Sequence, residues 1–168
     1  GSVFGNTGQD CCARSRILVE RKVFDDFVAG FVDTARAMTI GDPESESTQL
    51  GPLVSAAHRN SVSSFLTDDV DAVMAGAAPD GPGFWMAPRV VVAPDPSSRI
   101  VRDEIFGPIA AIIPFDSEAE AIQMANDTIY GLAGSIWTEN LGRAVRVSRG
   151  VRSGVLSAVS AVGAVGVF

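Results

Sequence analysis

Hydrophobic and polar residues follow two alternating periods along this chain. Runs of consecutive apolar residues typical of strands occur at 17–19, at 90–92 within the strand-like segment 89–92, and at 109–113, where the length of the run suits a parallel strand covered on both faces. Between them, apolar residues three or four positions apart are typical of amphipathic helices, at 24–38 and 55–66. Such interleaving predicts an α/β fold.

The pattern is most regular in the first predicted helix. Asp25, Asp26 and Asp33 fall on the face opposite its apolar stripe, and the sequence 41–43 (Gly-Asp-Pro) ends it. The polar run 44–49 predicts an exposed loop, and the second helix is expected over 55–66. The stripe of the first helix consists of Phe24, Phe27, Val28, Phe31, Val32, Ala35 and Met38.

The second half predicts strand, helix, strand, helix, strand with short connections. Pro114 closes the apolar run 109–113, and Ser117 with Glu120 forms a capping box that opens a helix over 118–126. This order indicates right-handed parallel βαβ units. The later elements are a strand at 131–137, a helix at 142–148 stopped by Gly150, and a strand from Val155.

The last eleven residues differ from the rest. Residues 158–168 contain only Ala, Val, Gly, Ser and Phe, without turn or cap signals. We therefore predict a globular segment over 1–157 and an atypical low-complexity tail over 158–168.

Composition limits the possible partners. At 168 residues and 46% hydrophobic content, the chain is long enough for one globular domain with a core. A net charge of -7 argues against nucleic-acid or anionic membrane partners, which require a clustered positive face. No apolar run approaches the roughly 18 to 20 residues of a membrane span, and no leader pattern is evident, so we expect a soluble, cytoplasmic protein.

Cys11 and Cys12 are the only cysteines and lie side by side. Adjacent cysteines make a poor disulfide framework, which favours reduced thiols. A thiol is a strong nucleophile only as thiolate: Asp10 opposes ionisation, whereas Arg14 and Arg16 favour it if they turn the same way. The residues alone therefore leave two interpretations open, a reactive thiol and a small buried apolar residue.

The surroundings of the cysteines resemble the nucleophile signature of the aldehyde dehydrogenase superfamily. In that signature, glycine-glutamine-any-cysteine is followed by a small residue and by serine-arginine. By position, the family nucleophile falls on Cys11. The matching residues are Asn6, Gly8, Gln9, Cys11, Ala13, Ser15 and Arg16.

A second segment, Asp103-Glu104-Ile105-Phe106-Gly107-Pro108, is similar to another signature of this family. The resemblance implies that Glu104 holds the nicotinamide ribose and that Phe106 packs near the nicotinamide ring. Taken alone, the segment could equally be an exposed acidic pair before a core phenylalanine. Further family-like segments lie at 41–43, 51–54 and 125–132, where we expect Asn126 and Tyr130 to be structural.

The resemblance implies oxidation of a small-molecule aldehyde to a carboxylic acid with NAD or NADP, through a thiohemiacetal and a thioester on Cys11. It implies the parallel-sheet βαβ catalytic domain of the aldehyde dehydrogenase fold, lacking the N-terminal Rossmann-type domain. The family's oxyanion-hole asparagine and general-base glutamate precede the nucleophile motif, so we expect the isolated chain to be inactive. Family members are usually homo-oligomers.

Two alternative functions remain at this stage. One is a non-catalytic remnant or interaction fragment. The other is a cofactor-free thiol hydrolase in which His58, the single histidine, serves Cys11 as base, although a surface or helix-capping role is expected for it. We predict no metal site, because Cys11, Cys12 and His58 fit zinc-ligand spacing poorly.

Overall fold

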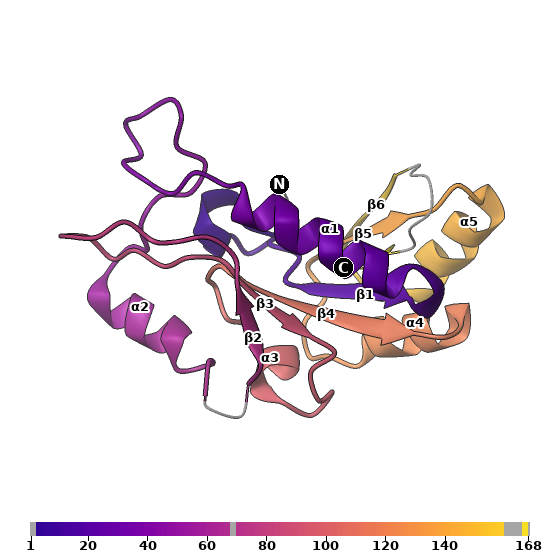
Figure 1. Ribbon diagram of the computed structural model, residues 1–168. Helices are drawn as coiled ribbons and strands as arrows, with labels where there is room; N and C mark the ends of the chain where they lie inside the picture. Colours follow the sequence, from indigo (N-terminus) through magenta and orange to yellow (C-terminus); the bar gives the residue numbers. More distant parts are fainter. Residues whose placement is uncertain (1–2, 68–69, 160–165, 168) are drawn as a thin grey trace.

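The computed structural model describes residues 3–67, 70–159 and 166–167, which form helices around one mixed sheet (Figure 1). The helical elements are η1 (Gly5–Gly8), η2 (Arg21–Val23), α1 (Phe24–Arg36), α2 (Ala56–Ser63), α3 (Arg99–Arg102), α4 (Glu118–Asn126) and α5 (Leu141–Gly150). The strands are β1 (Arg16–Glu20), β2 (Ala72–Met74), β3 (Arg89–Val92), β4 (Ile109–Phe115), β5 (Ala133–Trp137), β6 (Val155–Val159) and β7 (Gly166–Val167).

The sheet order is β2-β3-β4-β1-β7-β5-β6. The pairs β1–β4, β3–β4 and β5–β6 are parallel, while β2 runs antiparallel to β3 and β7 antiparallel to both β1 and β5. The expected parallel arrangement is therefore confirmed for most of the sheet. However, β4 and β5, which follow one another in the chain, do not pair, because β1 and β7 lie between them.

Two hydrophobic cores cover opposite faces of the β1–β4 region. Alternate side chains of a strand point to opposite faces, so Ile109, Ala111 and Ile113 join one core and Ala110 and Ile112 join the other. Helix α1 supplies the second core, and α2, α3, α4 and α5 supply the first. Figure 1 shows α1 lying along β1 and β4.

Most predicted elements are present, with shifted ends. Helix α1 buries Val32 and Ala35 and exposes its three aspartates, as expected. Helix α2 ends at Ser63 rather than Leu66, because the amides of Phe65 and Leu66 form tight i→i+3 bonds to Val62 and Ser63. The sequence did not predict η1, η2, β2, α3 or β7, each of which is at most four residues long.

Pro114 does not end its strand. β4 continues to Phe115, with Pro114 opposite Val19 of β1. The alternation of backbone groups turns the Pro114 nitrogen toward the β3 side, where pairing has already stopped at Val92. The missing N–H therefore costs no ladder bond, which explains why proline is tolerated here.

The capping box is confirmed at α4. The Ser117 hydroxyl accepts from the Glu120 amide (3.2 Å), and the Glu120 carboxylate accepts from the amide of Asp116 (2.7 Å), one residue before the cap. At α5, the side chain of Asn140 caps the amino end by accepting from the Arg143 amide at 2.9 Å. Both helix starts are thus fixed by short-range polar contacts.

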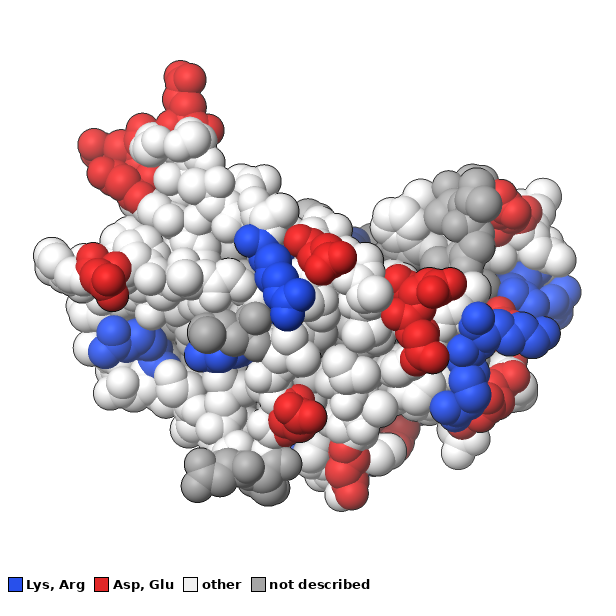
Figure 2. Space-filling model, viewed as in Figure 1, with Lys and Arg blue, Asp and Glu red and all other residues white. Residues whose placement is uncertain are grey.

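Charged side chains are distributed unevenly over the visible face in Figure 2. Acidic groups gather at the tip of the loop that follows α1, where Asp42, Glu44 and Glu46 are exposed. Near α4 and α5, opposite charges mix, because Glu118 pairs with Arg146 (2.7 Å) and lies 3.6 Å from Arg143. The predicted exposed loop at 44–49 is confirmed, with Thr48 half-buried.

The tail predicted at 158–168 is described only in part. Ala158 and Val159 complete β6, and Gly166–Val167 pair with β1 and β5, while 160–165 and 168 lie outside the described residues. The separate domain assignment of this tail therefore remains a prediction. In the described part of the chain, no helix is long and apolar enough to cross a membrane.

Candidate active site

The cysteine pair lies in a tight turn before β1. The turn is closed by the Ala13 amide donating to the Asp10 carbonyl (2.9 Å), and the Cys12 amide donates to the Asp10 carboxylate (2.8 Å). Within this turn Cys11 is exposed and Cys12 is half-buried. Cys11 is therefore the more accessible thiol.

The two thiols also differ electrostatically. Their sulfur atoms are 4.0 Å apart, and this contact, followed by burial and the charges of Cys11 and Asp10, raises the pKa of Cys12 above its ordinary value. Arg14 acts in the opposite direction on the same thiol. The raised pKa disfavours the thiolate form of Cys12 at neutral pH. Asp10, Cys11 and Cys12 hold their potential ligand atoms within 4.8 Å of one another, and His58 is not part of this group.

The segment before the cysteines is held in an unusual conformation. Asn6, Thr7 and Gly8 have consecutive positive φ angles of 50°, 56° and 74°. Gln9 fastens the segment to the loop 51–54, because its side-chain oxygen accepts from the Val54 amide at 2.9 Å. The Thr7 hydroxyl donates to the Gly51 carbonyl at 2.9 Å. These bonds give the motif's glutamine a structural role.

A glycine contact joins the two sequence signatures. A Cβ at Gly8 would lie 2.1 Å from the carbonyl oxygen of Gly107 and 3.0 Å from the nitrogen of Pro108. A Cβ at Gly107 would in turn lie 2.5 Å from the side chain of Val62 in α2. A side chain at position 8 is therefore excluded by the Gly107 backbone, and one at position 107 by the Val62 side chain, which explains both glycines of the motifs.

Cys11 and Glu104 line one pocket of about 250 Å³. Its walls come from the segments that immediately precede β1, β4, β5 and β6. These four strands point the same way, because β7 is antiparallel to both β1 and β5. The pocket therefore lies at the amino ends of the strands. Open α/β sheets more often bind ligands at the carboxyl ends.

The structure separates the two predicted cofactor residues. Glu104 is exposed, its amide donates to the Tyr130 hydroxyl (3.2 Å), and its carboxylate makes no hydrogen bond or ion pair within the described ranges. Phe106 is 39% exposed, has a φ of 56° and does not line the pocket of Cys11. Phe106 is thus not the core phenylalanine of the alternative interpretation.

His58 contacts Phe106 instead of Cys11. Its Nε2 donates to the Phe106 carbonyl at 2.8 Å, and the two rings meet edge to face at 6.0 Å. Its own amide donates to the Ser55 hydroxyl at the start of α2. His58 is not among the residues that line the Cys11 pocket. A base role for His58 in a cofactor-free hydrolase gains no support from this placement.

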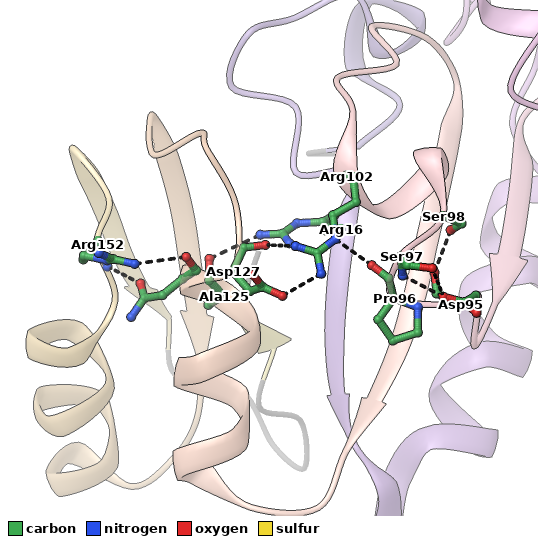
Figure 3. A network of polar contacts seen from close by, with 10 residues as sticks. Arg16, Asp95, Pro96, Ser97, Ser98, Arg102, Ala125, Asp127 and Arg152 are labelled. Atoms are coloured by element: carbon green, nitrogen blue, oxygen red, sulfur yellow. Dashed lines mark hydrogen bonds and ion pairs between the residues drawn. The ribbon is translucent and has the colours of Figure 1, made fainter.

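Four arginines line the pocket, and Figure 3 shows three of them, Arg16, Arg102 and Arg152, in a network of polar contacts. Arg102 donates to the Asp127 carboxylate (2.7 Å) and to the Pro96 carbonyl (2.8 Å), while Arg16 donates to the Ala125 carbonyl at 3.3 Å. Figure 3 shows Arg16 and Arg102 next to one another. Burial and then the charge of Arg102 lower the pKa of the Arg16 guanidinium from its ordinary value. Arginine nevertheless stays charged at neutral pH.

Asn126 and Tyr130 hold the frame of the site. The Asn126 side chain donates to the Gly150 carbonyl (2.8 Å) and accepts from the Arg152 amide (2.7 Å), joining the end of α4 to the segment before β6. Tyr130 holds the backbone of Glu104. These contacts are structural in kind, as expected for both residues.

Sequence reasoning did not anticipate that Arg102 and Arg152 line the same pocket as Cys11. They lie 91 and 141 positions further along the chain, and no local pattern around them signals a site. Only the common direction of the strands brings them together.

Comparison with known proteins identifies the family. The model of the aldehyde dehydrogenase family matches residues 1–164. A 2-aminomuconic 6-semialdehyde dehydrogenase from Pseudomonas sp. is 40% identical over 163 residues, covering 92% of this chain and 33% of the relative. A 2-hydroxymuconic semialdehyde dehydrogenase from Pseudomonas putida is 42% identical over 164 residues, covering 92% and 34%.

Solved structures of aldehyde dehydrogenases are also similar to this chain. A betaine aldehyde dehydrogenase from Staphylococcus aureus in complex with NAD+ superimposes with a TM-score of 0.86 at 35% identity, covering 94% of this chain and 33% of that one. An aldehyde dehydrogenase mutant from Pseudomonas syringae, in complex with NAD+ and octanal, has a TM-score of 0.87 at 32% identity, covering 94% and 34%. The chain thus spans about a third of the length of these relatives. The sequence matches, the fold and the two joined signatures together show that this chain belongs to the aldehyde dehydrogenase family.

Proposed function

We propose that this chain carries the nucleophile of an NAD(P)-dependent aldehyde dehydrogenase, with Cys11 as the attacking thiol. The observation that carries the proposal is the shared pocket of Cys11 and Glu104, whose motifs touch through Gly8 and Gly107. The accessible Cys11 and the raised pKa of Cys12 favour the first of the two thiols.

Cys11 performs the covalent part of the reaction. Its thiolate attacks the aldehyde carbon, forming a C–S bond and placing negative charge on the carbonyl oxygen. The Cys11 amide is the backbone donor proposed for this oxyanion, since the Cys12 amide is already bound to Asp10. A nicotinamide dinucleotide, when bound, supplies the hydride acceptor that makes a thioester of this adduct. Water then attacks the thioester carbon, the C–S bond breaks, and the acid and the thiol are released.

Glu104 is the residue of this chain that fits the cofactor. Its exposed carboxylate is free to accept from the two ribose hydroxyls, as a sugar clamp requires. We propose Phe106 as the second contact, next to the nicotinamide ring, since its ring is exposed and it lies two residues after Glu104 in the same motif.

Covalent labelling tests the nucleophile. With a small α,β-unsaturated aldehyde such as crotonaldehyde as the probe, we expect Cys11→Ala to abolish rapid labelling and Cys12→Ala to retain it, as measured by mass spectrometry. Equal labelling of the two variants would overturn the assignment.

Cofactor titration tests the carboxylate. Glu104→Gln is expected to weaken NAD+ binding about tenfold, because a charge-assisted hydrogen bond is replaced by a neutral one. Asp103→Asn is the control, since Asp103 pairs with Arg99 at 3.1 Å. An unchanged affinity in Glu104→Gln argues against the clamp.

The non-catalytic alternative makes the opposite prediction. Cofactor-dependent aldehyde oxidation by the 168-residue chain would exclude it. A chain that binds neither cofactor nor aldehyde would favour it.

A further inference from the structure

The pocket beside Cys11 has a charge opposite to that of the chain. The chain carries a net charge of -7, yet four arginines and only two carboxylates line this pocket. The four cations are Arg14, Arg16, Arg102 and Arg152, and the carboxylates are Asp103 and Glu104. Such a local excess of positive charge attracts an anionic group.

Most of the negative charge near the pocket is already engaged. Asp127 receives the ion pair of Arg102 (2.7 Å), and Asp103 that of Arg99 (3.1 Å). Within the described residues, no carboxylate lies within ion-pair distance of Arg14, Arg16 or Arg152. Arg16 donates a hydrogen bond to the backbone carbonyl of Ala125, and Arg152 donates one to the backbone carbonyl of Asn126. The positive charge of the pocket is therefore only partly compensated.

Arg14 differs from its neighbours. It is half-buried, it lines the same pocket as Cys11, and its Nε is buried without a hydrogen-bond partner in the described part of the chain. The Arg14 guanidinium at the pocket therefore carries a charge that no carboxylate of the described residues neutralises through an ion pair. Arg14 is also not one of the residues that match the nucleophile signature.

We propose that this pocket binds the carboxylate of a carboxylate-bearing aldehyde, with Arg14 contacting the carboxylate while Cys11 attacks the carbonyl carbon. The proposal rests on the proposed function, because it takes Cys11 as the nucleophile. A guanidinium presents planar, parallel N–H donors that match the two oxygens of a carboxylate. A substrate with a quaternary ammonium group is disfavoured by the same arginines.

Charge-matched thiol reagents test this preference without a cofactor. The probes are the 2-carboxyethyl, 2-hydroxyethyl and 2-(trimethylammonio)ethyl methanethiosulfonates, which share one reactive group. Each thiolate attack forms a mixed disulfide and releases methanesulfinate. Rates are measured on the Cys12→Ala chain, which reports Cys11, and on the Cys11→Ala chain, which reports Cys12, and each is divided by the rate of a free small-molecule thiol. We expect the ratio of carboxyl to ammonium rates to exceed one, and Arg14→Gln to lower it about five- to tenfold.

Two further variants separate charge from structure. Arg14→Lys keeps the charge and is expected to retain most of the preference, whereas the exposed Arg149→Gln in α5 removes an equal charge away from the pocket and leaves the ratio unchanged. The proposal is overturned if Arg14→Gln leaves the ratio of carboxyl to ammonium rates the same as in the chain that retains Arg14. If Arg14→Gln fails to fold, as judged by circular dichroism, loss of the preference in Arg152→Gln supports the pocket and an unchanged ratio opposes it.

The outcomes also distinguish this inference from the proposed function. If Cys11 reacts faster than Cys12 with all three probes but shows no charge preference, the assignment of Cys11 as nucleophile is supported and the carboxylate site is contradicted. Cys11 that reacts no faster than Cys12 contradicts the nucleophile itself.

Discussion

The two halves of the sheet are built differently. Around β1 and β4 both faces are covered, and the burial of β4 is nearly complete from Ile109 to Phe115. In the β5–β6 half, Ile136 and Val147 join one core only, and Val155 and Leu132 are 61% and 52% exposed. Cys11, the proposed nucleophile, precedes β1 of the doubly covered half, while part of the pocket lining precedes β5 and β6 of the singly covered half. We therefore expect the side of the pocket next to β1 and β4 to open less readily than the side next to β5 and β6.

The largest effect expected from this contrast concerns the cores. Ile112→Ala is expected to lower the free energy of unfolding by about 3 kcal/mol, since Ile112 is 0% exposed and its removal leaves a cavity. Val155→Ala, at the exposed edge, is expected to cost less than about 1 kcal/mol. Urea denaturation measures both. Similar losses at the two sites would contradict the contrast.

The next effect tests how the doubly covered half positions Cys11, the proposed nucleophile. Gly8→Ala is expected to destabilise the chain by roughly 2 kcal/mol and to slow Cys11 labelling, because the new Cβ overlaps the Gly107 carbonyl at a φ of +74°. Gly5→Ala is the matched control, since a Cβ there meets nothing within 4 Å. Unfolding curves and labelling rates together report the outcome. Equal behaviour of the two variants would remove the proposed link between the signatures.

A smaller effect is expected where the singly covered half is fastened. Asn126→Ala removes one bond to Gly150 and one from Arg152 and is expected to cost about 1 to 1.5 kcal/mol. Hydrogen exchange should then rise at β6 more than at β4, because the lost contacts hold the segment before β6. Uniform exchange over the two strands would show that the halves unfold as one unit.

The smallest effect concerns an ion pair on the outer surface of α4. The hydrogen bond to Arg146 and then the charges of Arg146 and Arg143 lower the pKa of Glu118 below its ordinary value. Its contribution is therefore complete above the ordinary carboxyl pKa of about 4.3 and is lost as the pH falls through the lower folded value. Glu118→Gln should flatten the acid limb of the stability profile, measured by urea midpoints from pH 7 to pH 2. A parallel profile for the variant would contradict this role.

Local rules predicted the elements that short-range chemistry controls. The α4 cap depends on Ser117 and Glu120, and the solvent face of α1 follows from three aspartates at helical spacing. The same rules failed at Pro114, because whether a missing N–H matters depends on where the neighbouring strand stops. They could not recognise β2, whose three residues pair with a distant partner.

Periodicity and motifs were enough to predict the alternation of strands and helices, to reveal the family resemblance, and to nominate Cys11, Glu104 and Phe106 as candidate site residues. Only the folded chain shows that Cys11 and Glu104 share a pocket, that Phe106 lies outside it with His58, and that four arginines line it. These two sets of features differ because the interactions behind them differ in range. Caps, turns and periodicity act over a few residues, whereas the pocket exists only because four strands begin at the same edge of the sheet.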